Sequence, residues 1–177
     1  EYFISSCFNF KFSKPNIIIK KINKINNNIL QAVNIMLNIN CRLMDYDINN
    51  IEDKFTIESK KLLPKNNYIG LSITQGNVYR KKEWPLNNIV NLCQKLKKNN
   101  KTPVFFIEKK NIKLKNKIQE LIPCSLFPEH ESNLSSPALV TCLGKRLDFA
   151  ITIDNGVMHM LSLSKVPMIS LFGPTDS

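Results

Sequence analysis

The residues best suited to bind a ligand lie in one short segment near the carboxyl end of the 177-residue chain. An apolar run over 149–153 is followed directly by Asp154, Asn155 and Gly156, and His159 follows after two more residues. This order predicts a strand, a tight turn and a helix that begins at a glycine. The first N–H groups of such a helix have no partner within it, and its amino terminus carries a partial positive charge. The segment therefore indicates an anion site that would suit a nucleotide diphosphate.

Each candidate residue could have a purely structural role instead of a functional one. Asn155 could simply cap the helix at a strand-to-helix turn, and His159 could be an ordinary core or surface histidine. Lys82 belongs to a basic stretch, 80–82, that precedes another predicted helix start. Its ammonium group could reach a phosphate as a point charge, or it could be a solvated lysine.

The elements that must position these residues alternate regularly from residue 68 onward. Apolar runs predict strands, and stripes at helical spacing predict the helices between them. Alternation with short connections predicts a parallel sheet with helices on both faces, a Rossmann-like α/β fold. The predicted strands are 68–74, 102–107, 124–127, 149–153 and 166–172. One helix is predicted to begin at Pro85, and three others are predicted over 111–122, 137–144 and 157–164.

Ligands of such sheets bind beyond the carboxyl ends of the strands, so polar residues at those ends are the site candidates. Thr74, Glu108, Leu134 and the segment 154–159 all fall at this edge. Within the helix 111–122, the spacing predicts that Ile112, Ile118, Leu121 and Ile122 face inward.

The first 66 residues differ from the rest. The pattern predicts a strand within 1–14, a helix over 17–37 and an irregular, polar segment over 40–66 with one short strand. We therefore expect residues 1–66 to be the end of an amino-terminal domain with an interdomain linker. Residues 67–177 would be the ligand-binding domain, truncated at its end.

Composition limits the function without choosing it. The formal charge of +11 suits nucleic acid, an anionic membrane surface or phosphorylated substrates, and the excess is largest over 67–131. Five cysteines without pattern argue against a disulfide framework and a zinc site, and favour small core residues. The sequence contains no G-x-G-x-x-G or P-loop pattern and no apolar run long enough for a transmembrane helix.

Three motifs, in this order and spacing, make residues 68–177 resemble the carboxyl-terminal half of the lipopolysaccharide heptosyltransferases, glycosyltransferase family 9. The first is K-x-W-P at 82–85, which opens a helix after the first strand. The second is D-N-G-x-x-H at 154–159, where the family usually has D-[ST]-G-x-x-H. The third is L-F-G-P-T-D at 171–176. The resemblance implies a two-domain GT-B architecture in which this half binds the nucleotide-sugar donor.

The resemblance also implies an activity. It is the inverting, metal-independent transfer of a sugar, typically heptose from ADP-heptose, to a lipopolysaccharide core acceptor. No cofactor and no metal are implied, and nucleic acid is not an expected partner. The implied location is cytoplasmic, where a basic surface would suit peripheral contact with anionic lipid at the inner face of the inner membrane.

Site roles follow from the matching motifs. By resemblance, Lys82 would contact donor phosphate, and Gly156 and His159 would hold the diphosphate at the helix amino terminus. Asp154 and Asn155 would position the donor sugar.

Three further positions are implied at the strand ends. Leu134 would fall near the adenine, and Thr74 would lie at the edge of the first strand. The family's glycine-rich turn after the second strand is replaced here by Glu108-Lys109-Lys110-Asn111, so Glu108 is the residue that could supply the ribose contact.

Two other functions stay open at this point. One is a basic, non-catalytic α/β module that binds anionic lipid or nucleic acid. The other is an enzyme of the same architecture that uses a UDP-linked rather than an ADP-linked sugar.

The resemblance places the general base of the family near the start of the amino-terminal domain, upstream of the residues in this chain. We therefore predict that the 177-residue chain binds donor but transfers no sugar by itself. An assay of sugar transfer with the isolated chain checks this prediction, and turnover above the no-enzyme background would contradict it.

Overall fold

The computed structural model describes residues 51–74 and 84–172, which all belong to one compact unit that begins at Asp47. The strand and helix expected within 1–37, Lys82 and its basic stretch, and residues 173–176 of the third motif lie outside the described residues. In chain order the described elements are α4 (Asp53–Leu62), β1 (Tyr68–Ser72), α5 (Leu86–Lys98), β2 (Thr102–Phe105), the 3₁₀ turn η3 (Lys109–Asn111), α6 (Ile112–Leu121), α7 (Pro128–Glu131), α8 (Pro137–Gly144), β3 (Phe149–Ile153), α9 (Gly156–Leu163) and β4 (Met168–Leu171).

The four described strands form one parallel sheet in the order β2-β1-β3-β4. Gly70 of β1 pairs with Val104 on one side and with Ala150 on the other. The chain therefore adds β2 on one side of β1, then returns to add β3 on the other side of β1 and β4 beyond it. This doubly wound arrangement confirms the predicted α/β class, and it places a topological switch point between the carboxyl ends of β1 and β3.

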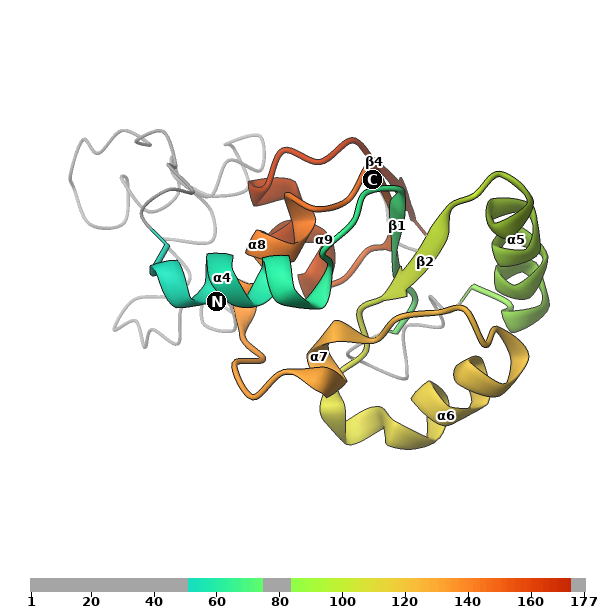
Figure 1. Ribbon diagram of the computed structural model, residues 1–177. Helices are drawn as coiled ribbons and strands as arrows, with labels where there is room; N and C mark the ends of the chain where they lie inside the picture. The colour runs from blue at the N-terminus through green and yellow to red at the C-terminus, as the bar shows by residue number, and fades with distance from the viewer. Residues whose placement is uncertain (1–50, 75–83, 173–177) are drawn as a thin grey trace, which may run out of the picture. The chain divides into compact units, whose positions relative to one another are not determined.

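Side chains alternate between two cores, one on each face of the sheet, as a parallel sheet requires. On one face Leu71, Phe105 and Ile107 pack with buried residues of α5 and α6. On the other face Val104 and Phe106 pack with α8 and α9. Figure 1 shows α5 and α6 on one side of β1 and β2, with α4, α8 and α9 on the other. Each core holds a set of helices against the sheet, so both faces position the strand ends.

The predicted strand 124–127 is reduced to a single residue. Leu126 alone joins the ladder, as a parallel bridge to Val104 with hydrogen bonds to Phe105 and Pro103. A turn in which Ser125 donates to the carbonyl of Ile122 precedes it, and α7 starts two residues later. The turn and the helix start leave no length for a strand. Leu126 nevertheless lies beside β2, where a further strand would extend the edge of the sheet.

The segment predicted to be irregular contains a helix. α4 packs against α8, and Phe55, Leu62 and Leu63 join the core of that face. The sequence signal was weak because the helix carries few apolar residues among many charged ones. Asp53 in its first turn and lysines in its last turn agree with the helix dipole. The guanidinium of Arg146 holds the end of α4 by donating to the carbonyls of Leu63, Pro64 and Lys65.

The inward face of α6 is only partly as predicted. Ile118 and Ile122 are buried, whereas Ile112 and Leu121 are each about half exposed. Leu114, Ile118 and Ile122 follow one another at intervals of four and face the sheet together. At about 100° per residue, Ile112 lies about 120° around the helix from Ile118, too far to share its contact.

Cys93 and Cys142 are buried core residues, in agreement with the expectation for scattered cysteines, and the three described cysteines are free thiols. Burial, with a smaller contribution from Cys124, raises the pKa of Cys93 to about 12. A thiol that stays protonated at neutral pH is a poor nucleophile.

A close contact between α8 and α9 makes Gly144 essential for packing. A methyl group added at Gly144 would overlap the Ser164 hydroxyl and approach its Cβ to 2.7 Å. We expect Gly144→Ala to lower the free energy of unfolding by about 1–3 kcal/mol, because the helices would have to separate. Urea denaturation of Gly144→Ala, Ser164→Gly and the double variant measures this effect. Removing the Ser164 side chain should restore much of the loss, and additive effects of the two substitutions would contradict the proposed contact.

Candidate functional site

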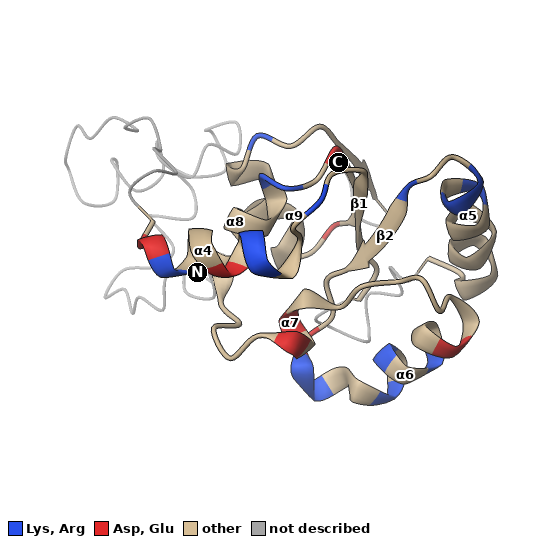
Figure 2. Ribbon diagram, viewed as in Figure 1, with Lys and Arg blue, Asp and Glu red and all other residues tan. Residues whose placement is uncertain are grey.

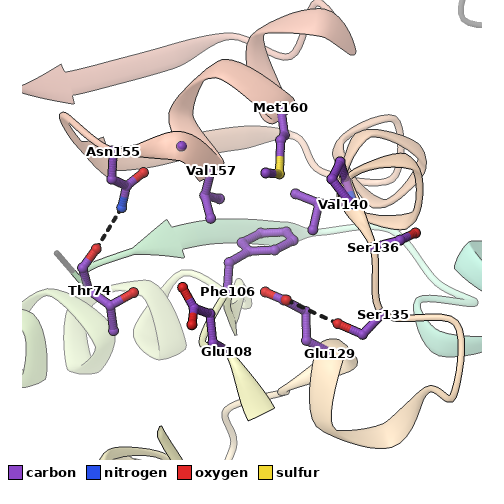
Figure 3. A pocket seen from close by; sticks show the side chains of 12 residues that line it. Thr74, Phe106, Glu108, Glu129, Ser135, Ser136, Val140, Asn155, Val157 and Met160 are labelled. Atoms are coloured by element: carbon purple, nitrogen blue, oxygen red, sulfur yellow. Dashed lines mark hydrogen bonds between the residues drawn. The ribbon is translucent and has the colours of Figure 1, made fainter. Parts of the chain in front are cut away.

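A cavity of about 210 Å³ lies at the switch point, beyond the carboxyl ends of β1, β2 and β3. Figure 3 shows its wall, which combines the end of β1, the end of β2, the segment from α7 to α8 and the first turns of α9. The lining residues are Thr74, Phe106, Glu108, Glu129, Ser135, Ser136, Pro137, Val140, Asn155, Gly156, Val157 and Met160. Segments far apart in the sequence thus meet at the position where ligands bind in doubly wound sheets.

Asn155 connects the strands at this point to α9. Its side-chain amide donates to the hydroxyl of Ser72 and to the backbone carbonyl of Thr74, both at 2.8 Å. Its side-chain oxygen accepts from the backbone N–H of Met158 at 3.0 Å and so caps α9. Both amide hydrogens and the amide oxygen therefore contact protein atoms, and the start of α9 is held beside the end of β1.

Two helix amino termini line the cavity, and they differ in what they offer an anion. In α8 the first residue, Pro137, has no N–H, and the Ser136 hydroxyl takes the N–H of Leu139. In α9 the cap takes only the N–H of Met158, so Gly156 and Val157 precede the capped residue with N–H groups that have no partner inside the helix. α9 is therefore the better anion site of the two.

Gly156 keeps the approach to this helix terminus open. It is exposed, and a Cβ added there would meet only the Met160 methyl group at 4.0 Å. A ligand atom can therefore come close to the backbone of Gly156, and a side chain at this position would occupy that space without disturbing the protein itself.

Two carboxyl groups face each other at the opposite side of the cavity (Figure 3). Glu108 is exposed and forms an ion pair with Lys110. Glu129, the second residue of α7, is only 8% exposed, and it accepts a 3.3 Å hydrogen bond from the Ser135 hydroxyl. Burial raises the pKa of Glu129, the Ser135 hydrogen bond opposes this shift, and the nearby Glu108 adds to it. Glu129 thus holds its proton to higher pH than an ordinary glutamate.

His130 follows Glu129 and packs behind the end of β2. Its ring lies edge-on to Phe127 at a centroid distance of 6.4 Å. Burial lowers its pKa, hydrogen bonding to the backbone of Ile107 and Glu108 opposes the shift, and Lys115 and Lys109 add to it. A lowered pKa favours the neutral imidazole at pH 7, so His130 contributes contacts to the chain beside Glu108 rather than positive charge.

The structure brings together four of the residues predicted from sequence. Thr74, Glu108, Asn155 and Gly156 all line the cavity. His159 is exposed on α9 and Asp154 is half-buried, and neither lines it.

Leu134 is also half-buried and outside the cavity wall, and its N–H donates to the Ser132 hydroxyl at 3.0 Å. Its neighbour Ser135 does line the cavity.

Sequence reasoning missed Glu129 and the apolar part of the wall, Phe106, Val140, Val157 and Met160. Apolar residues of this kind predict strands and helices, and their pattern does not show which of them will line a cavity. A signal for Glu129 was present, because Pro128 after the apolar run 124–127 predicts a helix start at the edge of the sheet. Glu129 then falls in the first turn of that helix.

A second, larger cavity of about 720 Å³ lies on the other side of Thr74. Apolar side chains from the start of α5, among them Trp84, Leu86 and Ile89, form part of its wall, and lysines of η3 and α6 form another part. Thr74 lines both cavities, so the end of β1 separates them.

A doubly wound parallel sheet with a cavity at its switch point, beside a glycine that opens a helix, defines a Rossmann-like α/β domain. The family model of Glycosyltransferase family 9 (heptosyltransferase) matches residues 8–177, so the chain belongs to this family. A comparison with curated proteins gave no match.

Solved structures agree with this fold. Glycosyltransferase family 9 from Veillonella parvula DSM 2008 is similar with a TM-score of 0.61 and 18% identity, over 72% of this chain and 38% of that one. E. coli ADP-heptose lps heptosyltransferase II has a TM-score of 0.57 and 20% identity, over 72% and 40%. E. coli heptosyltransferase WaaC with ADP has a TM-score of 0.51 and 17% identity, over 67% and 38%. The matched part spans about two fifths of the length of these proteins.

The Asn155 hydrogen bonds predict a graded loss of stability. Asn155→Ala removes the helix cap and both donors to β1, and we expect it to lower the free energy of unfolding by about 2 kcal/mol. Asn155→Ser keeps a capping oxygen and loses the amide donors, so about half of that loss is expected. Urea denaturation measures both variants. Equal stability of the alanine and serine variants would show that the cap contributes nothing.

Proposed function

We propose that this chain is the donor-binding half of a family 9 glycosyltransferase that transfers heptose from ADP-heptose to a lipopolysaccharide core acceptor by inverting, metal-independent displacement. One observation carries the proposal: the cavity at the switch point is bounded by an open glycine at the amino terminus of α9. Family membership and two similar structures, one an ADP-heptose heptosyltransferase and one a heptosyltransferase with ADP, support the choice of nucleotide.

The diphosphate of the donor would lie at the first turn of α9. The N–H groups of Gly156 and Val157 and the helix dipole favour negative charge there. Leaving-group charge builds up on the diphosphate as the bond to the sugar breaks, so the same groups would stabilise the transition state. This stabilisation by backbone N–H groups is the basis of the proposed metal-independent transfer.

The remaining site residues have proposed roles of two kinds. Lys82 and His159 would contact the diphosphate, Asp154 the donor sugar, Glu108 the ribose and Leu134 the adenine side. Asn155 acts on the donor through Gly156, because its own polar groups bond to Ser72, Thr74 and Met158.

The charge distribution bears on the acceptor and on the alternative function. Figure 2 shows Lys and Arg spread over α4, α5 and α6, whereas α7, which lines the cavity, carries acidic residues. A spread of this kind suits peripheral contact with anionic lipid. None of the helices in the described part of the chain is long and apolar enough to cross a membrane. We propose a cytoplasmic enzyme that meets its acceptor at the membrane surface.

A binding experiment on the full 177-residue chain tests the proposal. Calorimetric titration with ADP should give binding, and UDP should bind more weakly. Gly156→Ala should weaken ADP binding about tenfold or more by blocking charge-assisted hydrogen bonds to the backbone, while leaving the unfolding free energy unchanged. His159→Ala and Lys82→Ala should also weaken ADP binding. Lys97→Ala, which removes one exposed lysine from the last turn of α5, is the charge-matched control and should bind normally.

The same titrations separate the alternatives. Tighter binding of UDP than of ADP would replace the proposed donor with a UDP-linked sugar. The basic-module function would be established instead by a chain that binds no nucleotide but binds a DNA duplex or anionic vesicles. That binding should weaken with salt and be unchanged in Gly156→Ala.

A further inference from the structure

The cavity has opposite polarity at its two sides. The first turn of α9 presents backbone N–H groups at Gly156 and Val157, whereas Glu108 and Glu129 present carboxyl oxygens across from it (Figure 3). A phosphate group is favoured at the first side and repelled at the second. A bound nucleotide is therefore oriented by charge, with its phosphates at α9 and its nucleoside toward the two glutamates.

Glu129 has unsatisfied hydrogen-bonding capacity at this second side. One oxygen, Oε2, accepts from the Ser135 hydroxyl at 3.3 Å. The other, Oε1, is buried and has no hydrogen-bond partner within the described part of the chain. Leaving a buried acceptor without a donor is unfavourable, and a carboxylate with one weak hydrogen bond is especially poorly satisfied. The terminal torsion of a glutamate is soft, so a small rotation is enough to turn either oxygen toward a ligand.

The surroundings of Glu129 determine what kind of ligand group fits. Phe106, Val140 and Met160 form an apolar wall beside it, which suits the flat face of a base or the carbon skeleton of a ribose. In their ionised form Glu129 and Glu108 can only accept hydrogen bonds, and a ligand group between them that is an N–H or an O–H donor satisfies both and favours this form. Ser135, Glu129 and Glu108 then make an edge that accepts hydrogen bonds from the ligand.

We propose that Glu129 is a specificity-determining residue that accepts a hydrogen bond from an N–H or O–H group on the nucleoside part of the bound nucleotide. The inference rests on the proposed function, because it requires the cavity to be the nucleotide site. Two groups have the required chemistry: the amino group of an adenine and a hydroxyl of the ribose. A purely structural alternative is that Glu129 only holds Ser135 and the segment before α8 in place.

The experiment combines protein variants with ligands that each lack one donor. Four forms of the 177-residue chain are titrated: the wild type, Glu129→Ala, Glu129→Gln and Ser135→Ala. Each is titrated with ADP, with purine riboside 5′-diphosphate, which lacks the amino group, and with 2′,3′-dideoxy-ADP, which lacks both ribose hydroxyls. Glu129→Gln keeps the size of the side chain, so it gives an answer even if the alanine variant does not fold. Ser135→Ala removes the hydrogen bond to Oε2 and leaves the carboxyl group in place.

We expect the wild type to prefer ADP about tenfold over the analogue that lacks the contacted donor, since a hydrogen bond to a charged acceptor contributes about this much. The preference should vanish in Glu129→Ala, shrink in Glu129→Gln and survive in Ser135→Ala. Loss of the preference against purine riboside diphosphate assigns the contact to the amino group. Loss against the dideoxy analogue assigns it to the ribose.

Two results would overturn the inference. If the wild type binds ADP but Glu129→Ala and Glu129→Gln leave both preferences unchanged, Glu129 has only a structural role and the proposed function stands. If the Glu129 variants lower the affinity for all three ligands by the same factor, Glu129 shapes the cavity and does not recognise a group of the nucleoside. Failure of the wild type to bind any of the three ligands would instead remove the proposed function, and this inference with it.

Discussion

The hydrogen bonds of Asn155 are the interaction on which the site depends. One side chain joins the last residues of β1 to the first turn of α9 and caps that helix. β1 and β3 are neighbours at the centre of the sheet. The contact therefore joins β1 to α9 at the switch point, where the sheet changes its winding direction. The glycine that follows is thereby held at the cavity with its N–H directed along the helix axis. Asn155 therefore both caps α9 and supplies the two donors that reach the end of β1.

The two cores make this arrangement rigid enough to be useful. Each face of the sheet buries its own set of aliphatic and aromatic side chains, so the strands cannot shift relative to the helices without opening one core. α8 and α9 approach closely at their carboxyl ends, where Gly144 meets Ser164, and the amino termini of both helices line the same cavity. Only α9 keeps two uncapped N–H groups there, because a proline begins α8. The proline at the start of α8 therefore makes α9 the better place for an anion.

Much of the fold was predictable from the sequence, for local reasons. The strands and helices from residue 68 onward follow from apolar periodicity, and Ser136 and Asn155 both cap helices as their residue types suggest. The prediction was wrong where local pattern was weak or in conflict. α4 has few apolar residues, and its stability depends on contact with α8. The run 124–127 has strand composition, yet the turn before it and the proline after it leave one paired residue. Ile112 and Leu121 were predicted to face inward with Ile118, yet both are about half exposed.

The sequence by itself determined the alternating α/β order, the glycine at the start of α9 and the motifs of the family, because these depend on residues that are close together in the chain. Only the tertiary structure decided which strand ends meet. It gave Asn155 its partners on β1, which are more than 80 residues away. It also brought Glu129 across from Gly156 and buried its carboxyl group beside apolar side chains. Burial and long-range pairing are set by how whole layers pack, and no local pattern of residues encodes them.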